Sequence, residues 1–110
     1  MPPQSTSQLV AVYHSTDVMA MLAPDPQDWL QDRAQHYRHV ATVNAPLECI
    51  FEYTNHSEES AWITRPEVVW VVPGVRLRST SVGDVFVDEA SGCAYLVAPQ
   101  GLQEIASSTA

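Results

Sequence analysis

Short apolar runs recur along the chain, separated by polar residues and turn formers. Valine-rich runs of this length are typical of β-strands. The run at residues 9–14 is almost continuously apolar, so we expect a strand buried on both faces of a sheet. A loop with a glycine at 88–92 predicts a hairpin, and 102–105 leaves a further short strand open as an alternative. The predicted strands cover residues 9–14, 39–44, 68–72, 82–87 and 93–98.

Two segments between these runs have helical signals. Asp25 is placed to cap a first helix over about residues 26–37, which would bury Trp29 and Leu30. The second predicted helix follows Pro46 and ends near Asn55, a residue type that tolerates the left-handed conformation common after helices. Its apolar stripe repeats at i, i+3, i+4 and i+7, in Leu47, Ile50, Phe51 and Thr54.

The order β-α-β-α-β-β-β predicts an α+β fold, with two helices packed on a small, mainly antiparallel sheet and a C-terminal hairpin. We expect one domain over residues 9–105, with a disordered N-terminus at 1–8 and a flexible tail at 106–110. The predicted core consists of Val10, Val12, Leu30, Val40, Ile50, Phe51, Val69, Val71, Val85, Val87 and Leu96.

The charge of the chain limits the classes of partner that it can bind. Thirteen Asp and Glu residues stand against five Arg and no Lys, so the net charge is −8. Such a chain repels phosphate backbones, which disfavours direct nucleic-acid binding. The charge either keeps the protein in solution or forms an acidic surface for a basic protein partner, and a homo-oligomer stays open.

We expect the protein to be cytoplasmic, from the absence of membrane and secretion signals and from its cysteines. No apolar run approaches the roughly 18 residues that a membrane span needs, and the N-terminus has no basic residue of the kind that starts a secretory signal. The two cysteines, Cys49 and Cys93, have no CxxC spacing. We expect two reduced thiols, with a Cys49–Cys93 disulfide as the alternative.

The sequence supplies no complete set of catalytic or metal-ligating residues. His36 and His39 are three residues apart, but the first helix is expected to end between them. No nucleophile elbow or phosphate-binding glycine motif is present. We therefore predict no metal, no cofactor and no catalytic residue, and enzymatic activity stays open.

Two polar clusters are candidate binding residues. The first, Asn55, His56 and Trp62, is either a ligand-facing corner or a helix end with a tryptophan that anchors the next loop. The second surrounds Gly83 and could bind an anion. Alternatively it forms a turn, in which Asp84 caps backbone amides or pairs with an arginine and Arg78→Ala changes stability little. We favour the structural interpretation of both. The second cluster consists of Arg76, Arg78, Ser79, Ser81 and Asp84.

Several strings in the chain resemble segments of one group of proteins. They are residues 39–43, residues 47–51, Thr54-Asn55-His56, Trp62 and, most specifically, Ser79-Thr80-Ser81-Val82-Gly83-Asp84-Val85. The segment from about 39 to 105 resembles short uncharacterised proteins of phages, plasmids and other mobile elements, and its end is similar to YodL-like domains. The resemblance implies an accessory role on a mobile element and transfers no activity.

Two hypotheses follow. In the first, the chain is a protein-binding module that acts through an acidic surface and inhibits a host defence or nucleic-acid enzyme. In the second, it is a small-ligand-binding protein or an enzyme, with a pocket near Asn55, His56, Trp62 and Arg78. We favour the first.

Overall fold

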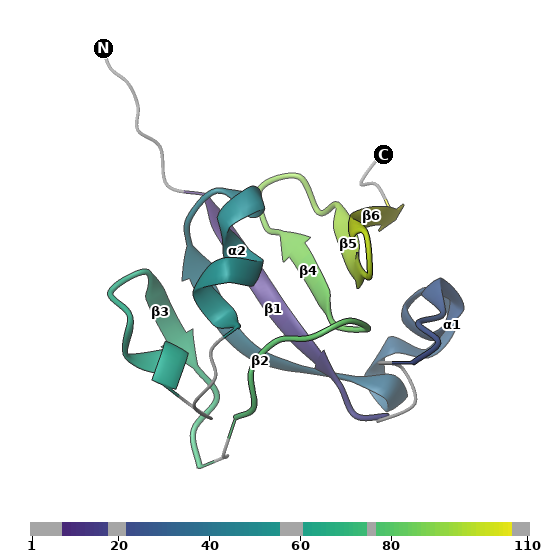
Figure 1. The fold of residues 1–110 in the computed structure, drawn as a ribbon, viewed down its shortest axis with the longest axis horizontal. Helices are drawn as coiled ribbons and strands as arrows, with labels where there is room; N and C mark the ends of the chain where they lie inside the picture. Colours follow the sequence, from purple (N-terminus) through teal and green to yellow (C-terminus); the bar gives the residue numbers. More distant parts are fainter. Residues whose placement is uncertain (1–7, 18–21, 56–60, 75–76, 107–110) are drawn as a thin grey trace.

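The computed structural model describes residues 8–17, 22–55, 61–74 and 77–106 (Figure 1). Of the N-terminus predicted to be disordered at 1–8 and the tail predicted to be flexible at 106–110, the structure describes only Gln8 and Ala106. Ala106 is the last residue of a strand and not part of a flexible tail. The elements, in chain order, are β1 (Leu9–Ser15), α1 (Pro26–His36), β2 (Tyr37–Asn44), α2 (Leu47–Thr54), the 3-10 helix η2 (Ala61–Thr64), β3 (Val68–Val71), β4 (Val85–Asp88), β5 (Ala94–Ala98) and β6 (Gly101–Ala106).

The six strands form one sheet in the order β3-β2-β1-β4-β5-β6, and each neighbouring pair is antiparallel. The predicted α+β class, with two helices and a C-terminal hairpin, is confirmed. The segment at 102–105, left open from the sequence, forms a sixth strand that pairs with β5.

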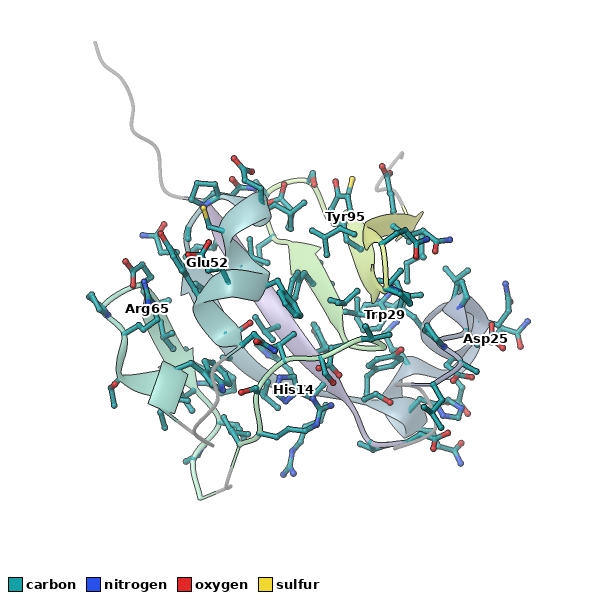
Figure 2. The ribbon with its side chains drawn as sticks, in the orientation of Figure 1. His14, Asp25, Trp29, Glu52, Arg65 and Tyr95 are labelled. Atoms are coloured by element: carbon teal, nitrogen blue, oxygen red, sulfur yellow. The ribbon has the colours of Figure 1, made fainter. Side chains whose placement is uncertain are left out.

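Strand β1 lies in the middle of the sheet and carries apolar side chains on both faces, as predicted. Val10 and Val12 pack with Ile50 of α2 in one buried cluster. Tyr13 packs against the second cluster, which is formed around Trp29 of α1 (Figure 2). Figure 1 shows α2 lying across the middle of the sheet and α1 beyond its β5–β6 end. The two helices therefore serve two separate parts of the core.

The predicted core was wrong at three positions. Leu30 and Phe51 are exposed, and Val69 is 54% exposed. Each helix is short and buries a narrow stripe: α1 buries Trp29, and α2 buries Ile50 and Thr54. Val69 lies on an edge strand, so one side of that strand has no neighbour in the sheet. Val71 and Val87 are half-buried, and the other predicted core residues are buried.

The ends of the elements also differ in places from the prediction. Asp25 does cap α1, because its carboxylate accepts a hydrogen bond of 2.9 Å from the amide of Gln27. Tyr37, predicted in that helix, instead begins β2. Asn55 ends α2 in an extended conformation, with φ −105°, and not in the left-handed one. The strand predicted at 82–87 begins only at Val85, because the residues before it turn around Gly83.

Candidate functional site

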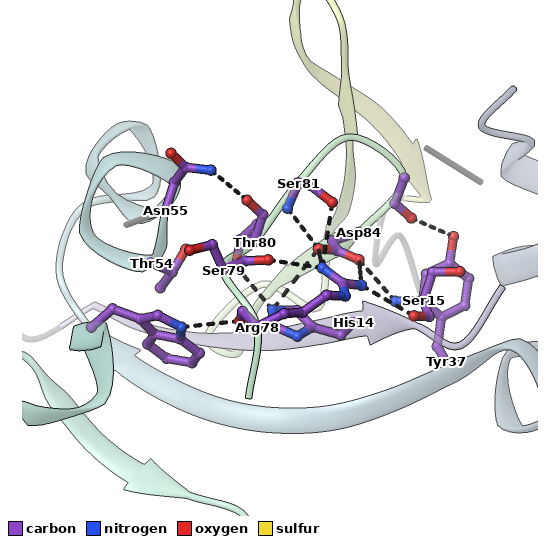
Figure 3. A network of polar contacts seen from close by, with 12 residues as sticks. His14, Ser15, Tyr37, Thr54, Asn55, Arg78, Ser79, Thr80, Ser81 and Asp84 are labelled. Carbon is purple, nitrogen blue, oxygen red and sulfur yellow. Dashed lines mark hydrogen bonds and ion pairs between the residues drawn. The ribbon is translucent and has the colours of Figure 1, made fainter. Parts of the chain in front are cut away.

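The polar residues singled out in the sequence meet where the segment 77–84 passes between the end of α2 and strand β1 (Figure 3). Asp84 lies at the centre and is fully buried. Its Oδ1 accepts a hydrogen bond from the Ser15 amide, and its Oδ2 accepts one from the Ser81 amide, both at 2.8 Å. The carboxylate thus joins the end of β1 to the turn that precedes β4.

Arg78 neutralises this carboxylate. Its two Nη atoms donate to the two Asp84 oxygens at 2.7 Å each, which is a bidentate ion pair. The same Nη atoms also donate to the carbonyl oxygens of Ser79, at 2.9 Å, and Ser15, at 3.1 Å. The Arg78 side chain remains 38% exposed, whereas that of Asp84 is 1% exposed. The predicted pairing of Asp84 with an arginine and its capping of backbone amides are therefore both confirmed.

His14 and Thr80 form the inner side of the network. The His14 Nε2 lies 3.1 Å from the Thr80 hydroxyl oxygen and 3.9 Å from Asp84 Oδ2. Both residues are buried. Burial lowers the pKa of His14 to about 4; Asp84 raises it by a smaller amount, and Arg78 lowers it further. The imidazole is consequently neutral near pH 7. Its contact with Thr80 is therefore a hydrogen bond between two uncharged groups.

Asn55 and Trp62 hold the segment from the side of α2. The Asn55 side-chain amide donates to the Thr80 carbonyl at 2.7 Å, and the Trp62 indole N–H donates to the Arg78 carbonyl at 3.1 Å. The Thr80 amide donates to the carbonyl of Thr54, the last residue of α2. Trp62 thus ties η2 to the segment 77–84, while the loop between α2 and η2 lies outside the described residues.

Tyr37 closes the network at its other end. Its hydroxyl donates to the Gly83 carbonyl at 2.9 Å. Burial is the largest of the effects that raise the pKa of this phenol to about 12, and the carboxylates of Asp28, Asp84 and Asp25 add to it. The hydroxyl therefore keeps its proton and its hydrogen bond throughout the physiological pH range.

The structure brings six of the eight predicted site residues to this segment, and the other two, His56 and Arg76, lie outside the described residues. Sequence reasoning missed three contributors, His14, Ser15 and Tyr37, and it placed Thr80 in the second cluster without naming it as a binding candidate. His14 had one usable signal, a histidine at the end of a buried strand. The polar groups of the network are directed at one another and at backbone atoms, so the network holds the fold together. The six predicted site residues that meet at this segment are Asn55, Trp62, Arg78, Ser79, Ser81 and Asp84.

A second feature, an apolar groove, was missed by the sequence analysis. It has a volume of about 520 Å³ and lies between α2 and the turn that joins β5 to β6. Two large apolar side chains line it, Phe51 of α2 and Leu102 of β6, which are 37% and 36% exposed. Glu48 contributes the one charged side chain of the lining. The remaining lining residues are Val82, Val97, Ala98, Pro99 and Gly101.

Three other sequence predictions, on a metal site, a disulfide and a membrane span, can be compared with the structure. Across the described ranges, no three His, Cys, Asp or Glu side chains gather in a way that could hold a metal ion. Cys49 and Cys93 are free thiols, each half-buried, so the alternative of a disulfide between them is wrong. None of the helices described is long and apolar enough to cross a membrane.

Comparisons with known proteins give no family for the chain, so its function is inferred from the geometry described above. No protein-family model, no curated protein and no solved structure matches the chain.

Proposed function

We propose that this protein is a binding module that docks on a basic protein partner through the groove between α2 and the β5–β6 turn. The observation that carries the proposal is that two exposed apolar residues, Phe51 and Leu102, line one groove together with the charged Glu48. Large apolar side chains that flank a concave surface are typical of interaction sites.

The charge of the chain selects the kind of partner. With a net charge of −8, the protein attracts basic surfaces and repels acidic ones over distances of about a Debye length, roughly 8 Å at physiological salt. Glu48 and Glu52 are both exposed and lie one turn apart on α2. A partner segment with apolar side chains for the groove and Lys or Arg beside them fits both features.

The resemblance to short mobile-element proteins suggests what such a partner does. Enzymes that act on nucleic acids present basic surfaces to the phosphate backbone. An acidic module that covers such a surface would inhibit the enzyme, which makes a host defence or nucleic-acid enzyme the proposed target. The alternative pocket near Asn55, Trp62 and Arg78 has less support, because the polar groups of these residues are engaged by backbone and by Asp84.

The test compares the proteins retained from a bacterial lysate by the wild type and by two groove variants, Glu48→Lys and Phe51→Ser. We expect one basic protein to be retained by the wild type, released by raised salt, and lost from both variants. Matched controls on α1, Asp32→Lys and Leu30→Ser, make the same charge reversal and a similar apolar-to-polar change at exposed positions that do not line the groove, and should retain it. Retention that is identical for groove and control variants would refute the proposal.

A further inference from the structure

Strand β3 forms one edge of the sheet, because β2 is its single strand neighbour there. Edge strands are commonly protected against association by charged side chains or prolines. Residues 68–72 read Val-Val-Trp-Val-Val and contain neither. Val69 is 54% exposed and Trp70 42% exposed. The chain has a net charge of −8, and this exposed edge differs from that overall character because it is uncharged and apolar.

Trp70 ends a row of stacked rings that crosses three strands. Its ring lies 4.7 Å from that of His39 on β2, at an interplanar angle of 29°. The His39 ring in turn lies 4.9 Å from that of Tyr13 on β1, at 25°. Ring stacking of this kind adds to the stability of neighbouring strands. The row stops at the exposed Trp70 on the edge strand, where one more ring or strand could extend it.

A bulge sets the geometry at this edge. Thr42 pairs with Trp70 and Val43 pairs with Val68, so Val69 is an extra residue without a partner on β2. Val69 and Trp70 therefore lie together at the centre of the strand, flanked by Val68 and Val71. A two-fold axis through this centre would set Val68 against Val71 of a second copy, and Trp70 against Val69 of that copy.

We propose that two copies of this chain associate through β3 in an antiparallel, two-fold arrangement. The near-palindromic sequence of the strand favours a second copy over an unrelated segment, because each apolar side chain meets an apolar one. Two copies can approach here without placing like charges on β3 against each other. The isologous contact closes on itself, so association stops at a dimer. A strand of four residues makes a small interface, and we expect a Kd between about 10 µM and 1 mM.

Salt distinguishes this contact from the docking proposed above. The groove binds a basic partner, so raised salt weakens that complex. Two copies of an acidic chain repel each other, so raised salt should strengthen the dimer as the Debye length falls from about 30 Å at 0.01 M to about 3 Å at 1 M. The two associations therefore respond to salt with opposite signs.

Sedimentation of the purified full chain over a concentration series up to about 1 mM tests the proposal. We expect the mass to double as the concentration rises. In high salt, this doubling should occur at a lower concentration. The Trp70 fluorescence should shift to shorter wavelength with dimerisation, because Trp70 becomes buried while Trp29 and Trp62 are buried already.

The variant Val69→Glu should stay monomeric at concentrations where the wild type dimerises. Val69 is exposed and has no partner on β2, so the substitution should leave the thermal unfolding curve unchanged. Leu30→Glu adds the same charge at an exposed position on α1 and should still dimerise. A wild type that stays monomeric at 1 mM in high salt would overturn the proposal. So would dimerisation of Val69→Glu equal to that of Leu30→Glu.

Discussion

Arg78 and Asp84 form a bidentate ion pair in which the carboxylate is buried and the guanidinium reaches solvent. The asymmetry matters for stability. A buried carboxylate that loses its cation keeps the cost of its desolvation, whereas a partly exposed guanidinium that loses its anion can be hydrated. The sequence suggested an exposed pair with little effect on stability. The structure instead buries the Asp84 carboxylate, so we now expect a larger effect.

Arg78→Ala should therefore lower the free energy of unfolding by about 2–4 kcal/mol. Arg78→Lys should recover only part of the loss, because an ammonium cannot donate to both carboxylate oxygens in the bidentate geometry. Denaturant unfolding measures both. Arg65→Ala is the control: Arg65 pairs with Glu67 at 3.3 Å on the surface, and its removal should cost about 1 kcal/mol or less. Equal costs at the two arginines would show that the burial of Asp84 is not what stabilises its pair.

Gly83→Ala should destabilise the protein by about 1–3 kcal/mol. The φ angle of Gly83 is +99°, a region that residues with a Cβ rarely adopt. The Gly83 amide donates to the Val97 carbonyl and its own carbonyl accepts from Tyr37, so the backbone cannot relax without losing one of them. A double-mutant cycle with Tyr37→Phe measures this coupling, and the two changes should not be additive. An unfolding free energy unchanged by Gly83→Ala would contradict the prediction.

Local signals in the sequence were sufficient for most of the secondary structure. The Asp25 cap, the valine-rich strands and the loop at 88–92 each depend on residues close together in the chain. The pairing of Asp84 with a nearby arginine was predicted for the same reason, although the sequence left open whether Arg76 or Arg78 is the partner. The exposure of Phe51 was not, because the periodicity of an eight-residue helix does not say how wide a stripe the sheet will cover.

The rest of the site depends on contacts between distant parts of the chain. Tyr13 pairs with Val85, and this register brings His14 and Ser15 to Asp84, about 70 positions away. The sequence does not specify that β1 lies between β2 and β4, so no local pattern could select His14 for the network. The apolar groove has the same origin, because its two sides, α2 and the β5–β6 turn, are adjacent only in the folded chain.

Ile50 and Phe51 are neighbours on α2 with opposite surroundings. Ile50 is fully buried in the main core cluster, and Phe51 is exposed at the groove. Ile50→Ala should cost about 2–5 kcal/mol, whereas Phe51→Ala should cost clearly less. Thermal and denaturant unfolding of the two variants compare them directly. A larger cost for Phe51→Ala would mean that this ring belongs to the core, and it would remove the basis for the docking groove.

Stability should fall in acid because of His14. Its pKa is about 4 in the folded protein and about 6.5 when the chain unfolds. Between these values the unfolded chain binds a proton that the folded protein does not, so the free energy of unfolding falls as the pH falls. The contribution is fully present above pH 6.5 and decreases by about 1.4 kcal/mol per pH unit, to a loss of about 3 kcal/mol near pH 4.

His14→Gln isolates this contribution, because other groups titrate in both proteins and cancel in the difference. The groups that face His14 are Asp84, Arg78 and the hydroxyl of Thr80, with the Trp62 ring 6.1 Å away, and all remain in the variant. The wild type should exceed the variant in unfolding free energy by an amount that shrinks steadily from pH 7 to pH 4. NMR titration of the His14 ring protons gives the folded-state pKa independently. A difference between the two proteins that is constant with pH, or a midpoint of the ring titration near 6.5, would show that His14 is not the neutral, desolvated member of the network described here.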